Sequence, residues 1–443
     1  MPGLRRFLLP TLCTCALVSR ALADAPALSD SLTVGECVAR AREHAPEPRV
    51  LAAERIAAAL DSSAIFRARR AAFSFQVGAM VAPHRFYDPA ITNLGEYGLK
   101  LGVEAPLVDG GSRRRERERG ALASGESRLR LEQGARDAGL LAGALAVEWL
   151  RLTETERTQI EAVAWLEHLA GVMESGVRAG VRGRADALRA LLERDAAAAA
   201  LDLTRRDLAA TSRALTRAIG AGEPYRPAIR SESDSEVPPT DADSLALIAA
   251  LEHAPEVRLA GLSEAQRRID LDAARRGRSW QVGLAADAGL AGSDLTRIVP
   301  PDVTEAHPGA TFSDRLRRDL GASVSLQLRR PLFDPSARDA AAARLAAVEA
   351  QHLRQDVELD AQRRLALDLV ARWRSAALRL TLARDGAARA DEHLLRLASL
   401  HAAGAATLLE LLDARRALDD ARERLADARA EARAARLESE ERR

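Results

Sequence analysis

The chain has 443 residues, of which 3% are aromatic and 29% are charged, and its formal net charge is +1. This profile is typical of long helices that pack through small side chains, and it argues against two or three ordinary globular domains. A net charge so close to zero provides no general basic field, which excludes nucleic acid as a partner.

The N-terminus has the pattern of a secretory signal peptide. Arg5 and Arg6 precede an apolar run over residues 7–18, and small residues follow at Ala21 and Ala23. Because the apolar run is too short to span a bilayer, we interpret residues 1–23 as a signal peptide and not as a membrane anchor. No later segment has the uninterrupted apolar sequence that a transmembrane helix needs.

The cysteines fit an exported chain without covalent cross-links. Two of the three, Cys13 and Cys15, lie in the signal peptide, and neither follows the Leu-small-small pattern of a lipoprotein site. We therefore expect no lipidation. Only Cys37 would remain after export, which excludes a disulfide framework and a cysteine metal site. Export without a transmembrane helix indicates the periplasm or the outer membrane of a double-membraned bacterium.

Four segments alternate apolar and polar residues in the way that strands do: residues 73–81, 97–105, 280–290 and 320–328. Strict alternation gives each strand one apolar and one polar face. A tilted strand needs about 10 residues to cross a bilayer, which is the length of these segments. Four strands cannot close a barrel alone, and lipid does not tolerate open edges. The strands therefore either lie in soluble sheets or join a barrel shared between chains.

Helices are predicted around each pair of strands. Thr33 with Glu36 forms a capping-box pattern that opens a short helix, which ends before Pro46 and is followed by a second helix. The long helices are predicted over residues 112–175, 185–219, 335–399 and 407–440. The last of them carries a heptad pattern of leucine and alanine at Leu411, Ala414, Leu418, Ala421, Leu425 and Ala428.

The same order of segments occurs twice. The tetrapeptide His-Ala-Pro-Glu at residues 44–47 recurs at residues 253–256, and Gly180 is matched by Gly404. We therefore predict a first repeat over residues 24–220 and a second over residues 244–443. Each repeat would contain a helix, two strands and a long helical hairpin.

Two segments separate the repeated elements. Residues 221–243 are rich in Pro, Ser and acidic residues and are predicted to be a linker midway along the chain. Within each repeat a loop joins the two strands, and the loop of the second repeat, at about residues 291–318, is longer than that of the first, at residues 83–96. Insertions concentrate where the backbone faces water, so we expect both loops to lie on the outer rim.

Taken in this order, the strand pairs, glycine turns and long helices resemble the TolC-like outer membrane efflux protein family. The resemblance covers the chain from about Ser31 to the C-terminus. The motifs that carry it are Pro106–Gly111, Gly180–Asp186, Gln327–Asp334 and Gly404–Ala414.

This resemblance implies a mixed membrane protein. Three identical chains would each give four strands to a 12-stranded β-barrel, continuous with a long α-helical coiled-coil barrel in the periplasm. It implies a passive export duct in the outer membrane of a Gram-negative bacterium, with no enzymatic activity and no cofactor. The implied partners are a periplasmic adaptor (membrane fusion protein), an inner-membrane pump of the RND or ABC type, and outer membrane lipid.

Two other classes stay open at this point. The long heptad helices also suit a periplasmic coiled-coil adaptor or scaffold without a barrel. An exported enzyme is the second alternative, but the sequence contains no Ser/His/Asp order, phosphate loop or dinucleotide fingerprint that would support it.

Glu410 and Asp413 are the strongest candidates for site residues. They follow the Gly404 turn, three residues apart on one helix face. The resemblance implies an acidic pair that faces the pore at its periplasmic entrance, where three copies would form rings of carboxylates that favour cations. Asp186 matches Glu410 in the repeat and is a third candidate. The alternative is that these acids stabilise the first helical turn through the helix dipole.

The turns themselves are candidate contacts for the adaptor. The resemblance implies this role for Gly180, Val181, Arg182, Gly183, Gly404, Ala405 and Ala406. The alternative is that glycine is present only because a turn between two helices requires it.

Two other groups of side chains have less specific interpretations. His44 and His253 occupy equivalent helix breaks in the repeat, so we predict no metal site there, and the other histidines lack metal-ligand spacing. The arginines at positions 113, 114, 115, 117 and 119 are predicted to form either a solvated face or a basic belt lining the pore.

Overall fold

The computed structural model describes residues 31–68, 72–80, 96–222, 228–230, 238–277, 279–293, 311–330 and 336–443. The predicted signal peptide, the Pro331–Asp334 part of the second strand motif and most of the linker and inter-strand loops lie outside these residues. Contacts divide the chain into two compact units. The helical unit contains the described residues up to Ala53, Leu129–Val257 and Glu358–Arg443, and the sheet unit contains Glu54–Arg128 and Arg258–Val357.

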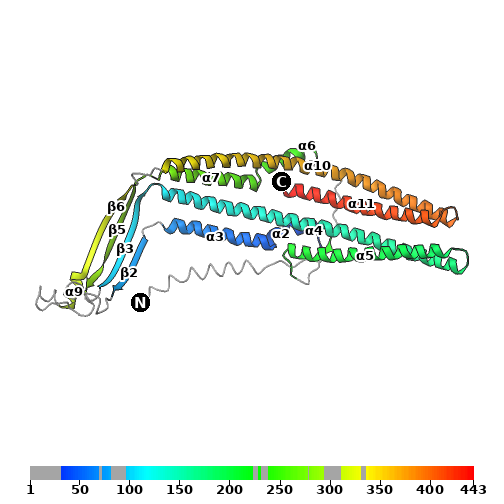
Figure 1. The fold of residues 1–443 in the computed structure, drawn as a ribbon, viewed down its shortest axis with the longest axis horizontal. Coiled ribbons are helices and arrows are strands. Elements are labelled where there is room, and N and C mark those ends of the chain that lie inside the picture. Colours follow the sequence, from blue (N-terminus) through cyan, green and yellow to red (C-terminus); the bar gives the residue numbers. More distant parts are fainter. Residues whose placement is uncertain are drawn as a thin grey trace. The chain divides into compact units, whose positions relative to one another are not determined.

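The elements of the first half are β1 (Ser31–Leu32), α2 (Val34–His44), α3 (Pro46–Ala68), β2 (Ala72–Met80), β3 (Glu96–Asp109), α4 (Ser112–Arg178) and α5 (Arg184–Ala218). Those of the second half are β4 (Ala228–Ile229), α6 (Asp241–Glu252), α7 (Pro255–Arg275), β5 (Gln281–Ser293), α9 (Phe312–Asp319), β6 (Leu320–Arg329), α10 (Ala337–Ala402) and α11 (Leu408–Glu441). Apart from α9, the order of elements in the second half follows that in the first (Figure 1).

The sheet unit is built on one antiparallel sheet in the order β2-β3-β5-β6, whose strands lie side by side in Figure 1. Its register pairs Val77 with Leu99, Leu99 with Leu290, and Leu290 with Leu320. Directly opposed residues share a face, so the apolar positions of all four strands lie on the same side. That face carries Phe73, Phe75, Val77, Leu99, Leu101, Val103, Leu284, Ala286, Leu290, Leu320, Val324, Leu326 and Leu328.

The opposite face of the sheet is polar and rich in glycine. Asp287 on β5 accepts a hydrogen bond of 2.6 Å from the Ser323 hydroxyl of β6. The four strands occur where alternation predicts them, but β3 continues beyond residue 105 to Asp109. A bulge between Pro106 and Val108 shifts the register there, which breaks the alternation that sequence analysis relies on.

The segment between β5 and β6 differs from the predicted loop over residues 291–318. β5 continues to Ser293, and α9 occupies the end of the range. Thr311 begins α9 with a capping box, in which the Asp314 carboxylate accepts from the Thr311 backbone N–H at 2.8 Å. A loop over the whole range was therefore the wrong prediction, because a capped helix of eight residues forms just before β6.

In the helical unit, the predicted helix breaks are present in both halves. The Thr33–Glu36 capping box begins α2, and Pro46 and Pro255 are the first residues of α3 and α7. A buried cluster of small and aliphatic side chains joins α2 to α4 and α5, and the fully buried Cys37 belongs to it. Burial raises the pKa of the Cys37 thiol to about 12, so this thiol stays protonated and unreactive.

The long helices pack through the heptad positions of α11. Leu411, Ala414, Leu418 and Ala428 are all buried, as the leucine–alanine pattern predicts. On α5, Leu201, Thr204 and Leu215 are the corresponding buried residues. Among the described helices, none combines the length and apolarity needed to cross a membrane.

Candidate functional site

The turn between α4 and α5 contains four of the candidate contact residues. Gly180 has a φ of +70°, a left-handed conformation that favours glycine. The backbone N–H groups of Val181 and Arg182 donate to the Gly176 carbonyl at 2.9 and 3.2 Å, which closes the end of α4. All four residues from Gly180 to Gly183 are exposed. The turn is therefore a hydrogen-bonded, accessible tip whose glycine is also explained by backbone geometry.

The turn between α10 and α11 is built in the same way. Gly404 has a φ of +76°, and the Ala405 N–H donates to the Leu400 carbonyl at 2.8 Å. His401 supplies an additional bond, because its Nδ1 lies 2.8 Å from the Ala406 carbonyl oxygen while its ring is buried. The sequence did not predict that His401 stabilises this turn, because its spacing from other residues suggests neither a cap nor a metal site.

Glu410 forms a capping box at the start of α11. Its carboxylate accepts from the Thr407 backbone N–H at 2.7 Å and from the Thr407 hydroxyl at 2.9 Å, and its own N–H donates to that hydroxyl at 3.2 Å. The bonds from Thr407 lower the pKa of the exposed Glu410 carboxyl. Glu410 thus has the helix-start role that the sequence left as an alternative, and its charge still faces solvent.

Asp186 occupies the same position at the start of α5. Gly183 is the residue before that helix and has no side chain, so the reciprocal capping box cannot form there. Asp413 is exposed one turn beyond Glu410 and lies 3.7 Å from the Arg416 guanidinium. Arg416 in turn pairs with Glu193 of α5.

A single hydrophobic cluster joins the starts of α5 and α11. Ala187 and Ala190 of α5 lie in it together with Leu408, Leu411 and Leu412 of α11. Residues of α4 and α10 complete the cluster. Asp186 and Glu410 are therefore each next to a helix face anchored in the same core, although the structure shows no direct bond between them.

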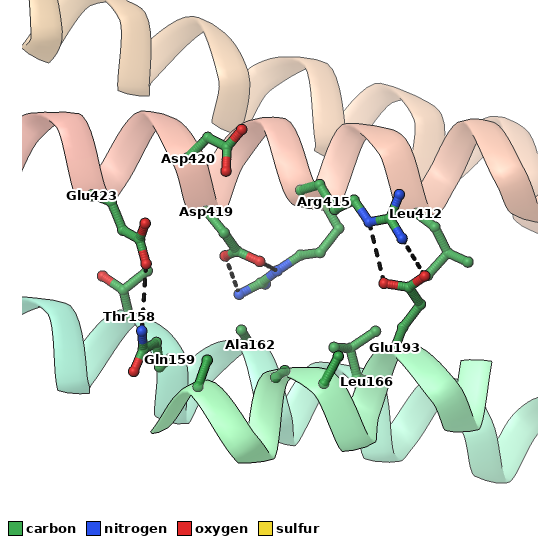
Figure 2. Close-up of a pocket in the computed structure, with 14 residues that line it drawn as sticks. Thr158, Gln159, Ala162, Leu166, Glu193, Leu412, Arg415, Asp419, Asp420 and Glu423 are labelled. Atoms are coloured by element: carbon green, nitrogen blue, oxygen red, sulfur yellow. Dashed lines mark hydrogen bonds and ion pairs between the residues drawn. The ribbon is translucent and has the colours of Figure 1, made fainter. Parts of the chain in front are cut away.

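A cavity of about 290 Å³ between α4, α5 and α11 adjoins this cluster and shares Leu166 and Leu412 with it (Figure 2). Arg415 extends into it with its side chain only 7% exposed and pairs with Asp419 at 2.8 Å. The Arg415 guanidinium also lies over the Trp165 ring, 5.4 Å from its centroid. Burial raises the pKa of the Asp419 carboxyl, and the bond from Arg415 opposes that shift. Figure 2 shows the Gln159–Glu423 bond at one end of the cavity and Glu193 at the other.

Further ion pairs join α4 to α11 outside the set of residues that line the cavity. Arg422 pairs with Glu161 at 2.8 Å, and Arg429 and Arg433 both reach Glu154, at 3.0 and 3.3 Å. The two helices come from different halves of the chain, so these pairs hold the halves together inside one protomer. Sequence analysis missed them. The signal available was the run of arginines beside the heptad positions of α11.

The arginine run at the start of α4 is largely paired. In the sheet unit, Arg115 lies 3.4 Å from Asp272 and Arg119 lies 2.7 Å from Asp270, both on α7. Arg114 pairs with Glu118 of its own helix at 2.7 Å. Arg115 and Arg119 therefore join α4 to α7, a role that neither a solvated face nor a pore-lining belt describes.

His44 and His253 lie at the helix ends where the repeat places them. His44 is the last residue of α2, and His253 is the residue that follows α6. Both lie at helix breaks. Within the ranges that the structure describes, no group of three His, Cys, Asp or Glu side chains is arranged to hold a metal ion.

A family model described as outer membrane efflux protein matches residues 246–438. The matched segment contains α7, β5, β6, α10 and nearly all of α11. This match confirms the resemblance that the sequence motifs indicated. The comparison with curated proteins finds no match.

Solved structures show a similar fold over nearly the whole chain. The outer membrane protein VceC from Vibrio cholerae has a TM-score of 0.70 and 17% identity, and the match covers 91% of this chain and 94% of that one. The CmeC outer membrane channel of Campylobacter jejuni has a TM-score of 0.70 and 12% identity, with coverages of 95% and 90%. The open state of the MtrE outer membrane channel of Neisseria gonorrhoeae has a TM-score of 0.64 and 16% identity, with coverages of 95% and 93%.

Proposed function

We propose that this chain, which resembles the outer membrane efflux proteins in sequence and in fold, is the channel subunit of a tripartite efflux pump. It would act as a passive duct across the periplasm and outer membrane of a Gram-negative bacterium. The observation that carries this proposal is the one-sided apolar face of the β2-β3-β5-β6 sheet.

That face is too exposed for a protein that stays in water as a single chain. Phe73 is 79% exposed, Val77 is 68% exposed and Val324 is 75% exposed. Contiguous apolar surface of this kind marks a site of contact with lipid or protein. Because every strand contributes to the same face, the sheet has the alternation of a transmembrane barrel wall, with apolar residues outside and polar residues inside.

The edges of the sheet support a shared barrel. Within the described residues β2 and β6 each pair on one side only. Backbone groups left unpaired in hydrocarbon are strongly unfavourable, so each edge requires another strand. Pairing of β2 of one copy with β6 of the next closes the ring, and three copies give the 12-stranded barrel that the family resemblance implies.

The long helices also present surface that one copy leaves uncovered. Exposed leucines lie on α5 at Leu188, Leu192 and Leu203, and on α10 at Leu367, Leu378, Leu382 and Leu395. Neighbouring copies covering these side chains would produce the continuous coiled-coil barrel. The recurring order of elements supports the predicted repeats over residues 24–220 and 244–443. In this proposal a linker over residues 221–243 joins the repeats, and a signal peptide over residues 1–23 precedes them.

We place the periplasmic mouth of the duct at the two helical turns. Glu410, Asp413 and Asp186 would form rings of carboxylates there, and like charges around a narrow opening favour cations. The exposed turns Gly180–Gly183 and Gly404–Ala406 would contact the periplasmic adaptor. An inner-membrane pump of the RND or ABC type would supply the energy, so no catalytic residue or cofactor is required of this chain.

Fractionation and conductance test the proposal together. We expect the chain to sediment with the outer membrane and to resist extraction by alkaline carbonate. In detergent solution it should be a trimer. The purified trimer should form ion-conducting pores in planar bilayers. Release by carbonate as a soluble monomer would contradict the proposal and would favour a periplasmic adaptor without a barrel.

A further inference from the structure

The apolar face of the sheet ends at a pair of side chains of a different kind. On β5 and β6 the last opposed residues are Val282 with Leu328 and Gln281 with Arg329. One step further along both chains, Trp280 and Arg330 return to the apolar side. The Arg330 guanidinium carbon lies 5.3 Å from the centroid of the Trp280 ring, and Trp280 is 50% exposed.

This pair lies at the end of the sheet from which the long helices continue. Trp280 follows α7 in the chain, and Arg330 precedes α10, whereas α9 lies at the other end of the strands (Figure 1). From Leu290 to Trp280 the strand extends about 33 Å at 3.3 Å per residue. With a tilt of about 40° this is roughly 25 Å across the bilayer, which is the height of the apolar band of outer membrane barrels. The pair therefore falls at the boundary of that band.

The chemistry of the pair suits a phosphate group. A guanidinium lying on an aromatic face keeps its N–H edge available, and it binds phosphate oxygens through two parallel hydrogen bonds. Among the residues that the structure describes, Arg330 forms no ion pair with a carboxylate. Tryptophan itself prefers the level of the lipid headgroups.

In the described part of the first half, the match of Pro106 with Pro331 makes Ala105 the counterpart of Arg330. The Trp280–Arg330 pair is therefore a local feature of β5 and β6 and would occur once per protomer.

We propose that Trp280 and Arg330 bind the phosphate of an anionic phospholipid at the periplasmic boundary of the outer membrane and so set the depth of the sheet. The proposal rests on the proposed function, because it requires the apolar face to lie in lipid. The site would recognise a phospholipid by the negative charge of its phosphate.

The depth of Trp280 tests this placement. Trp149, Trp165 and Trp373 are replaced by Phe, which leaves Trp280 as the only tryptophan of the sequence. The trimer is reconstituted in phosphatidylethanolamine–phosphatidylglycerol vesicles that contain lipid brominated either near the glycerol or near the chain end. We expect stronger fluorescence quenching by bromine near the glycerol. Stronger quenching from the chain end would overturn the depth assignment, whereas no quenching by either lipid would contradict the barrel itself.

Binding is tested separately with Arg330→Gln and a matched control, Arg329→Gln, whose charge lies on the other face of the sheet. Phosphatidylglycerol is titrated into phosphatidylcholine nanodiscs that hold the single-tryptophan trimer, and the Trp280 emission is followed. We expect a saturable response, about tenfold weaker in Arg330→Gln and retained in Arg329→Gln, since one charge-assisted contact is lost.

An unchanged response in Arg330→Gln would overturn the site, and so would an equal loss in Arg329→Gln. An equal response to inorganic phosphate alone would overturn the assignment to lipid. If Arg330→Gln does not assemble, the quenching experiment still decides the placement, because it keeps Arg330.

Discussion

Gly289 and Gly321 are directly opposed on β5 and β6, yet only Gly289 is closed in by a third strand. A Cβ atom built at Gly289 would lie 2.8 Å from the Cα atom of Lys100 on β3, and closer still to the Leu99 carbonyl oxygen. A Cβ atom at Gly321 would meet nothing within 4 Å. The close approach of β3 and β5 therefore depends on one glycine of this pair.

We expect Gly289→Ala to weaken the sheet and Gly321→Ala to be tolerated. Backbone atoms cannot move aside as a flexible side chain can, so a destabilisation of about 1–3 kcal/mol or more is expected for Gly289→Ala. The measurement is the fraction of purified chain that runs as a heat-stable oligomer on a gel, compared over a temperature series. Equal behaviour of the two variants would contradict the close approach of β3 and β5 at this position.

The capping box at the start of α11 allows the charge of Glu410 to be separated from its structural role. Glutamine supports a capping box as glutamate does, so Glu410→Gln removes the charge and keeps the helix start. Thr407→Ala keeps the charge and removes the cap, with an expected loss of about 1 kcal/mol in local stability. We expect Glu410→Gln combined with Asp413→Asn to reduce cation selectivity in bilayer conductance, with Asp202→Asn on α5 as the control.

Hydrogen exchange of residues 404–412 provides the second measurement for these variants. Thr407→Ala should speed exchange there and leave the selectivity intact. Glu410→Gln should leave the exchange unchanged and reduce the selectivity. If Thr407→Ala changes selectivity as much as the double charge variant does, the carboxylates act through the turn and not through a ring of charge.

The hydrogen bonds of Asp243 predict how the stability of the start of α6 changes in acid. Its carboxylate accepts from the Arg443 guanidinium at 2.6 Å and from the Thr240 backbone N–H at 2.9 Å, and these bonds, the Arg443 bond first, lower its pKa. A lowered pKa means that the carboxylate contributes stability above its unfolded-state value of about 4, and that this contribution is lost as the pH falls through the folded-state value.

We therefore expect Asp243→Asn to flatten the decline in thermal stability between about pH 5 and pH 2. The midpoint of unfolding is followed by circular dichroism across that range for the wild type and the variant. Asp202→Asn controls for the loss of one carboxylate. A decline as steep in Asp243→Asn as in the wild type would show that the Arg443 and Thr240 bonds do not set the acid response.

Local sequence signals predicted the elements of this fold well. Alternation located the four strands of the antiparallel sheet, because each of them has one apolar face. Thr33, Pro46 and Pro255 marked helix ends through chemistry that acts within one turn. The extension of β3 was missed because the bulge at Pro106 interrupts alternation. The helix α9 was missed although Thr311 and Asp314 carry the capping-box spacing.

Contacts that depend on how helices and strands pack in three dimensions could not be predicted from the sequence. Arg115 could have paired with any acid nearby, and only the packing of α7 against α4 selects Asp272. The meeting of Trp280 and Arg330 likewise requires the register of β5 with β6. At the candidate site the sequence offered two roles for Glu410, and the structure shows the capping role, while the gating role of Glu410, Asp413 and Asp186 stays a prediction.

The buried Arg415–Asp419 pair gives a prediction about the cavity between α4, α5 and α11. Replacing Arg415 by Met leaves the Asp419 carboxylate facing an apolar environment without its partner. Breaking a buried pair in this way typically destabilises a protein by 3–5 kcal/mol, and because Asp419 is 25% exposed we expect about 2–3 kcal/mol at neutral pH. The double variant Arg415→Met with Asp419→Leu removes both charges and is expected to be close to wild type.

The pH dependence identifies the cause of that loss. Burial already raises the pKa of Asp419 in the intact pair, and the loss of Arg415 removes the bond that opposes the shift. A raised carboxyl pKa means that the folded state takes up a proton more readily than the unfolded state, so the penalty in Arg415→Met should shrink as the pH is lowered from about 7 towards 5. Chemical denaturation of wild type, single and double variants at several pH values measures this. A penalty in Arg415→Met that does not change with pH would indicate lost packing against Trp165 as its source, because packing does not depend on the protonation of Asp419.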